Sequence, residues 1–242
     1  MSTVDFITFV CPKDIRRLHD NHEFDKRMSS HDFEFNDFHV IRQRCGNDFD
    51  DVVFTAKEHR SEDYPNILQD FGISESAKAE EMTHGPSGAH YWKWHVINHL
   101  IGLQVSTADY IVFQDCDCRM VSNGEFGDPW IPRGIDLLNH YPEILIVAPS
   151  DGGHEQVNTI YDPKGVIRLT QTVSQQMFLC DRKVLSKINF DVPWDWEFTA
   201  PGGPMAEFYY MLEGRMWRYM NKYRLFRAML PETWRYWHDG WH

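Results

Sequence analysis

Apolar and polar residues follow one another along this chain in blocks that predict strands and helices in turn. Residues 5–11 form a β-branched and aromatic run that predicts a buried first strand, and residues 51–55 have the same character. Residues 60–88 are polar and rich in turn residues, which predicts a loop with short helical pieces. Residues 91–105 carry apolar side chains at helical spacing, and residues 108–114 return to strand character.

The second half is less regular, but its elements can be placed. The pattern predicts a short helix at 135–139, strands at 144–148, 176–180 and 225–230, a hairpin of 157–161 with 166–170, a short helix ending at 188 and a helix over 205–213. The hairpin turn is Asp162-Pro-Lys-Gly165, and Pro204 stands at the first position of the last helix. Early strands that alternate with helices favour a parallel sheet covered on both faces, and the hairpin makes the later sheet mixed. We therefore predict an α/β fold.

Length and composition narrow the class of protein. The 242 residues suffice for one large domain with a substantial core, and 42% hydrophobic with 25% charged residues is typical of a soluble globular protein. No apolar run approaches the roughly 18 residues of a membrane helix, and no leader opens the chain, so we expect a cytoplasmic protein. Five cysteines without framework spacing favour a reducing compartment.

The charge balance is strongly acidic. Asp and Glu number 36 against 24 Lys and Arg, which gives a formal net charge of −12. Nonspecific nucleic-acid binding depends on neutralising phosphates, so this balance argues against a nucleic-acid partner. The same balance leaves room for a bound metal cation.

Two carboxylates follow the predicted strand at 108–114. Asp115 and Asp117 stand one residue apart at its carboxyl end, where ligands bind in open α/β sheets. Two acids at such a place can hold a hard divalent cation that also binds substrate phosphates. A second Asp-x-Asp, Asp48 with Asp50, has no buried strand before it and is assigned to a solvated position. Solvated acids after a strand remain the alternative for Asp115 and Asp117.

The run from Lys93 to Asn98, the apolar helix that follows, and the strand that ends in Asp115 and Asp117 together resemble the GT-A-fold, nucleotide-sugar-dependent glycosyltransferases. The order of elements is also similar over nearly the whole chain. The resemblance implies one glycosyltransferase domain over residues 1–242, with a Rossmann-like, mostly parallel sheet. Residues up to about 120 would bind the nucleotide sugar and metal, and residues from about 121 would bind the acceptor.

The resemblance also implies roles for particular residues. Asp117 would be the firmest metal ligand, and Asp115 would contact the nucleotide ribose, or the metal through water. Lys93 would reach the donor phosphates or sugar, although a solvated lysine at a helix start explains it equally well. The residues expected to lie against the base or ribose end the first strand: Val10, Cys11 and Pro12.

A histidine near the C-terminus is a further candidate ligand. Several GT-A enzymes supply a late histidine to the metal, and His238 is better placed for this than His242. Imidazole suits a borderline metal such as Mn²⁺, while carboxylates and phosphate oxygens also suit Mg²⁺. The alternative is that one of thirteen histidines falls near the chain end by chance.

An acidic residue is expected to deprotonate the acceptor hydroxyl if the reaction inverts the anomeric centre. Glu207 matches the position of that base in the family, although the family often has two consecutive acids and a first-turn Glu also favours the helix dipole. Asp195 and Glu197 are the rival candidates. Trp194 and Trp196 either stack on acceptor sugar rings or, as is commoner for aromatic residues, belong to the core.

Other candidate sites are weaker. His95 and His99 have a spacing that can bind zinc, but the glutamate of zinc proteases is missing beside them. Cys116 and Cys118 do not form Cys-x-x-Cys, and neither a phosphate-binding P-loop nor a Gly-x-Ser-x-Gly elbow occurs. The basic and aromatic stretch 215–227 either contacts a membrane surface peripherally or packs the C-terminal segment onto the sheet.

The reaction expected from the resemblance is a metal-dependent, hexosyltransferase-type transfer. A sugar would move from a UDP- or GDP-sugar to a glycan or other hydroxyl acceptor, with Mn²⁺ or Mg²⁺ bridging the diphosphate. If the configuration were retained, Gln175 or Gln176 would face the reacting carbon. One alternative is a sugar-phosphate nucleotidyltransferase, whose Gly-rich loop is missing from residues 11–17. The other is a non-catalytic sugar-binding protein, which leaves the paired acids without a purpose.

Overall fold

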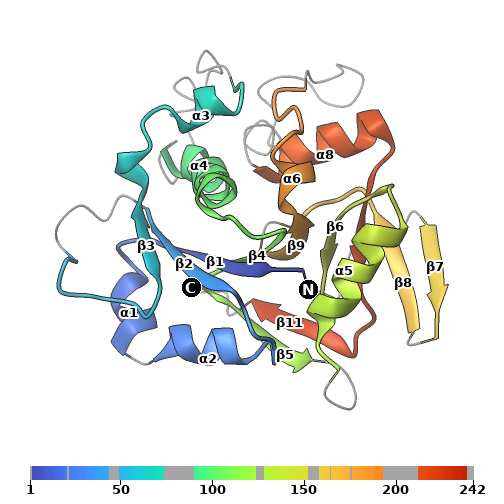
Figure 1. Cartoon of the computed structure of the whole chain (residues 1–242), viewed down its shortest axis with the longest axis horizontal. Coiled ribbons are helices and arrows are strands. Elements are labelled where there is room, and N and C mark those ends of the chain that lie inside the picture. Colours follow the sequence, from blue (N-terminus) through green and yellow to red (C-terminus); the bar gives the residue numbers. More distant parts are fainter. Residues whose placement is uncertain are drawn as a thin grey trace.

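Figure 1 shows the chain as a computed structural model. The structure describes residues 2–20, 22–43, 49–73, 90–123, 128–151, 158–163, 165–174, 176–192 and 212–238, with the side chains of residues 90–95 and of His238 excepted.

The first half of the chain builds a parallel sheet. Its strands are β1 (Val4–Val10), β2 (Asp37–Arg42), β3 (Lys57–Arg60) and β4 (Tyr110–Asp115), in the spatial order β3-β2-β1-β4. The chain adds β2 and β3 on one side of β1 and then returns to place β4 on the other side. The strand order therefore reverses between β1 and β4, which is where α/β sheets bind their ligands.

Among the residues that the structure describes, the second half makes the sheet mixed and extends it to nine strands. Strand β9 (Met177–Asp181) runs antiparallel between β4 and β6 (Ile144–Ala148), and β10 (Phe226–Met229) runs parallel to β6. The hairpin of β7 (Asn158–Asp162) and β8 (Gly165–Thr170) forms the other edge. A separate two-stranded ribbon pairs β5 (Cys118–Asn123) with β11 (Trp234–His238). The predicted α/β fold class is thus confirmed.

Helices cover both faces of this sheet (Figure 1). One face carries α1 (Ile15–Asp20), α2 (Glu23–Ser29), α5 (Trp130–His140) and the β5–β11 ribbon, and the other carries α3 (Ile67–Asp70), α4 (His90–Val105), α6 (Arg182–Leu185) and α8 (Leu212–Tyr223). Successive strand residues supply the two cores alternately, since Phe6 packs with the first group and Ile7 with the second. A 3₁₀ turn, η1 (Ser61–Asp63), precedes α3.

Most predicted elements are confirmed, but the strand predicted at 51–55 is wrong. Val52 and Phe54 are buried and Val53 is 69% exposed, so the residues alternate as in a strand. Their backbone is held by side chains instead: Arg42 donates to the Val52 carbonyl, and the Phe54 N–H donates to Glu58 Oε1 at 2.7 Å. The strands on this side are β2 and β3, and β2 was missed because polar residues interrupt its apolar pattern.

Helix α4 confirms the prediction at 91–105, although its apolar surface is wider than one stripe. Asn98 and His99 are buried together with the apolar residues of its second half. The helix predicted over 205–213 begins outside the described residues, and α8 is described from Leu212 onward.

Gly102 lies where α4 packs closely against the sheet, and it gives a first prediction. A Cβ atom there would stand 2.5 Å from Phe113 Cε1 and 3.0 Å from Ile7 Cδ1. We expect Gly102→Val to lower the free energy of unfolding by about 1–3 kcal/mol, because the added atoms overpack the interface. Urea unfolding measures this change. Gln104→Val, at an exposed position of the same helix, is the control, and an equal effect of both substitutions would contradict the overpacking argument.

Candidate metal and nucleotide site

The paired acids lie at the carboxyl edge of the sheet, where β1 and β4 are neighbours. Phe9 of β1 is in register with Asp115 of β4, so Val10, Cys11 and Pro12 continue beside the turn that carries Asp117. The Asp115 N–H donates to the Gln176 carbonyl at 2.7 Å, which joins the start of β9 to the same place. The structure therefore places the end of the first strand beside the acidic pair, while the binding roles of these residues stay predictions.

Asp115 points to the sheet face that α4 and α8 cover. Ile111 and Phe113 belong to the core of that face, and Asp115 continues their two-residue alternation. Burial raises the pKa of Asp115 well above its usual range, and the charges of Asp117 and of Glu213 on α8 raise it further. Three carboxylates this close repel one another, and the repulsion favours binding of a proton or a cation. Their oxygens are donors that Mg²⁺ and Mn²⁺ accept.

The β5–β11 ribbon carries the C-terminal histidine to the acidic turn. His238 is in register with Cys118, the residue that follows Asp117. His238 and Cys118 are 120 positions apart in the sequence, and only the antiparallel pairing of their strands makes His238 a neighbour of the acidic pair. The side chain of His238 lies outside the described part of the structure, so its ligation of a metal stays a prediction.

A directional chain of hydrogen bonds holds the acidic turn from the opposite face. Trp130 Nε1 donates to His31 Nδ1 at 3.0 Å, so the proton of the neutral ring is on Nε2, which lies 2.7 Å from Gln114 Oε1. Gln114 Nε2 donates to the Cys118 carbonyl at 2.9 Å, and Arg27 donates to the same oxygen. Complete burial lowers the pKa of His31 to about 4, which keeps the ring neutral.

Helix α4 runs from the carboxyl edge of the sheet to its amino edge. Near the carboxyl edge, Asn98 Nδ2 donates to Gln43 Oε1 at 3.0 Å, and the Gln43 N–H donates to the Val10 carbonyl at 2.7 Å. Lys93 lies five residues before Asn98 and so belongs to the end of the helix at the site. Its side chain lies outside the described residues, and its contact with donor phosphates stays a prediction.

Burial favours the protonated thiol form of the cysteines around the turn. Cys11 Sγ donates to Asp14 Oδ2 at 2.8 Å, and burial together with this bond raises the pKa of Cys11 to about 12. Burial raises the pKa of Cys116 and of Cys118 well above the usual value. Since the thiolate is the form that attacks carbon or binds metal, this burial disfavours a nucleophilic or metal-binding role for these thiols. The four cysteines of the described residues are all free.

Most of the residues predicted to act on the acceptor lie outside the described residues. Those not described are the base candidates and aromatic residues Glu207, Asp195, Glu197, Trp194 and Trp196, together with Gln175 and His242. Gln176 is described, and its Oε1 lies 3.2 Å from the Tyr236 hydroxyl. The assignment of the base therefore remains a prediction.

Two weaker sequence hypotheses are decided by packing. The ring of His99 stacks on Phe178 at 5.8 Å and packs against Phe9, so this histidine belongs to the core and not to a zinc pair with His95. Arg215 and Arg218 are buried and donate to the Phe190 and Val192 carbonyls, so the stretch 215–227 packs onto the protein. Among the helices described, none is long and apolar enough to cross a membrane.

Sequence analysis missed three residues that support the site: Gln114, His31 and Glu213. Gln114 offered a signal, because it is a polar residue inside an otherwise apolar strand immediately before the acids. His31 and Glu213 offered none, since their positions follow from packing between segments 83 or more residues from each other.

An α/β sheet whose strand order reverses between β1 and β4, with paired acids at that carboxyl edge, is typical of proteins that bind nucleotides. No protein-family model matches the chain, and no curated protein matches its sequence.

Several solved structures are similar to this chain. A mycobacterial protein is 14% identical, with 96% of this chain and 66% of that chain covered and a TM-score of 0.46. A glucosyl-3-phosphoglycerate synthase from Mycobacterium tuberculosis, in complex with Mn²⁺, UDP and phosphoglyceric acid, is 14% identical over 63% of this chain and 44% of that chain (TM-score 0.33). A mannosyl-3-phosphoglycerate synthase from Rubrobacter xylanophilus is 13% identical over 75% and 54% (TM-score 0.35).

The chain spans about half the length of these two synthases. Because these identities and TM-scores are low, the similar structures carry no functional argument, and the functional assignment rests on the residues of this chain.

Proposed function

We propose that this chain is a metal-dependent glycosyltransferase that moves a hexosyl group from a UDP- or GDP-sugar to the hydroxyl of a glycan or other acceptor. The observation that carries the proposal is the convergence at one sheet edge of Asp115, Asp117 and the strand position of His238. These residues come from two strands far apart in sequence, and they meet where the strand order reverses.

The donor set fits a divalent cation. Burial, and then the charges of Asp117 and Glu213, raise the pKa of Asp115, and a cation would relieve the repulsion among these carboxylates. Asp117 and Asp115 would hold Mn²⁺ or Mg²⁺, and His238 would complete the protein ligands. When bound, the metal would neutralise the negative charge that develops on the departing diphosphate.

The remaining residues of the edge would position the donor. Val10, Cys11 and Pro12 would contact the base or ribose, because they extend past the register partner of Asp115. Lys93 would bind donor phosphates from the α4 end at the same edge. Glu207, or its rival Asp195, would accept the proton of the acceptor hydroxyl in an inverting reaction.

The ligands recorded in the similar synthase structures are of the same classes. The mycobacterial enzyme is described in complexes with UDP and either Mn²⁺ or Mg²⁺, and also with UDP-glucose and phosphoglyceric acid. We extend to this chain only the class of ligand, a nucleotide diphosphate with a divalent cation, because that class is what its own acidic edge supports.

Thermal stabilisation by UDP and GDP, with and without Mn²⁺, tests the proposal. A ligand at about 100 times its Kd stabilises the native state by roughly 2.7 kcal/mol, so we expect a rise in the melting temperature that requires Mn²⁺. A response restricted to nucleoside triphosphates would contradict the proposal in favour of a nucleotidyltransferase. No response to any nucleotide would favour a non-catalytic sugar-binding protein.

A further inference from the structure

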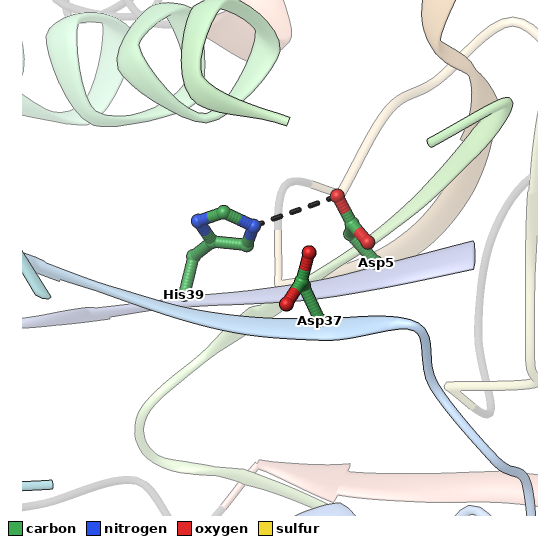
Figure 2. Close-up of side chains that lie close together, drawn as sticks. All are labelled: Asp5, Asp37 and His39. Carbon is green, nitrogen blue, oxygen red and sulfur yellow. Dashed lines mark ion pairs between the residues drawn. The ribbon is translucent and has the colours of Figure 1, made fainter. Parts of the chain in front are cut away.

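A second group of candidate metal ligands lies at the opposite edge of the sheet from the acidic pair. Asp5, Asp37 and His39 each offer one ligand atom, and these atoms all lie within 4.8 Å of one another. Figure 2 shows the His39 ring and the Asp5 carboxylate facing each other, with the Asp37 carboxylate between them. None of these residues contributes to the proposed donor site.

Strand register explains the juxtaposition. Asp5 of β1 pairs directly with Asp37 of β2, and His39 follows Asp37 by two residues, so the three side chains project from the same sheet face. Asp5 precedes Phe9, the register partner of Asp115, by four residues. At about 3.3 Å per residue, the two groups of acids are roughly 13 Å apart along β1.

The buried imidazole of His39 points its Nε2 atom into this group. Its side chain is 3% exposed, and Nε2 makes no hydrogen bond, although it lies at ion-pair distance, 3.5 Å, from Asp5 Oδ2 (dashed line in Figure 2). The other nitrogen, Nδ1, lies 3.0 Å from His59 Nε2, and His59 Nδ1 lies 3.1 Å from the Tyr64 hydroxyl. A histidine that binds metal through one nitrogen has its second nitrogen fixed in this manner by an outer partner.

The carboxylate of Asp5 is also oriented by outer partners. Ser106 Oγ donates to Asp5 Oδ2 at 2.7 Å, and Asn36 Nδ2 donates to Asp5 Oδ1 at 3.2 Å. Asp37 is the accessible member, with a side chain 29% exposed, and its Oδ2 accepts from Lys57 Nζ at 2.6 Å. Lys57 is therefore the cation that now neutralises the open side of the group.

We propose that Asp5, Asp37 and His39 form a binding site for a divalent transition-metal ion, with Zn²⁺ as the best fit. One imidazole nitrogen and two carboxylate oxygens are ligands that zinc accepts, and a water would complete a four-coordinate site. The ion would enter from the Asp37 side and displace the Lys57 ammonium. It would tie β1 to β2 at the amino edge of the sheet, separately from the donor site.

Zn²⁺ titration of the 242-residue chain by calorimetry tests this site. The titration is carried out on a chain that carries Asp117→Asn, which removes a ligand of the proposed donor metal. If the donor-site proposal is wrong, the measured affinity of the second site is therefore unaffected. In that background we expect Asp37→Asn to weaken Zn²⁺ binding at one site by tenfold or more, and His39→Gln to do the same. Lys57→Met should strengthen binding, because it removes the competing ammonium. Asp70→Asn, an exposed aspartate elsewhere, is the matched control.

The thermal midpoint provides a second readout. Because an ion that binds the native state raises stability, Zn²⁺ should raise the midpoint of the background variant and of its Asp70→Asn derivative, but not of its Asp37→Asn derivative. Asp37 is half-buried, so its substitution tests the site even if His39→Gln fails to fold. Equal Zn²⁺ affinity in the background and in its Asp37→Asn derivative, or weaker binding in its Lys57→Met derivative, would overturn the proposal.

Discussion

Asp117→Asn is expected to reduce Mn²⁺-dependent turnover of a UDP- or GDP-sugar by about 100-fold or more. The substitution keeps the shape of the side chain but removes the charge that would hold the cation at the carboxyl edge of β4. Loss of one preorganised group that stabilises developing negative charge typically costs about 10²–10³ in rate. Release of UDP from UDP-glucose, or of GDP from GDP-mannose, measures the change.

The second Asp-x-Asp sequence supplies a matched control. Asp50 is exposed and pairs with Arg60, so Asp50→Asn removes an equivalent charge at a surface position and should leave turnover unchanged. His238→Ala should lower turnover less than Asp117→Asn does, because both carboxylates remain. Full turnover by Asp117→Asn, or full turnover of the unchanged chain in excess chelator, would contradict a metal held at this edge.

The acidic edge was predictable because its main parts are adjacent in sequence. A buried strand followed at once by Asp115 and Asp117 places both acids at a carboxyl edge whatever the rest of the chain does. The first strand and the helix before β4 were predictable for the same reason, since each is a continuous run with a clear period. A continuous run of residues with a clear hydrophobic period is sufficient to predict a strand or a helix, without knowledge of what it pairs with.

The parts that the sequence could not supply depend on pairing between distant segments. The position of His238 beside the acidic turn follows from the register of β11 with β5. Strand β2 was missed because Asp37 and His39 occupy the face that a simple apolar alternation would fill. The same two residues belong to the proposed zinc site, so the polar residues that interrupt the strand pattern are those to which a chemical role is assigned.

The hydrogen-bonded chain beneath the acidic turn predicts how stability depends on pH. Burial lowers the pKa of His31 from 6.5 to about 4 in the folded protein. Between these two values the unfolded chain binds more protons at this residue than the folded protein does. The free energy of unfolding should therefore fall as the pH falls from about 6.5 to about 4, by about 3 kcal/mol from His31.

His31→Gln separates this contribution from the rest of the protein. A glutamine amide can accept from Trp130 Nε1 and donate to Gln114 Oε1, so the chain of hydrogen bonds to the Cys118 carbonyl is preserved in kind. Because glutamine does not titrate, urea unfolding at pH 7.5 and at pH 5 should show a clearly smaller loss of stability in the variant than in the unchanged protein. The shallower dependence of stability on pH should be accompanied by intact Mn²⁺-dependent nucleotide binding, since the acidic turn keeps its support.

His140→Gln, at the exposed end of α5, is the control and should leave the dependence of stability on pH as it is. An equal slope in all three proteins would show that His31 is not the buried neutral base that holds this turn.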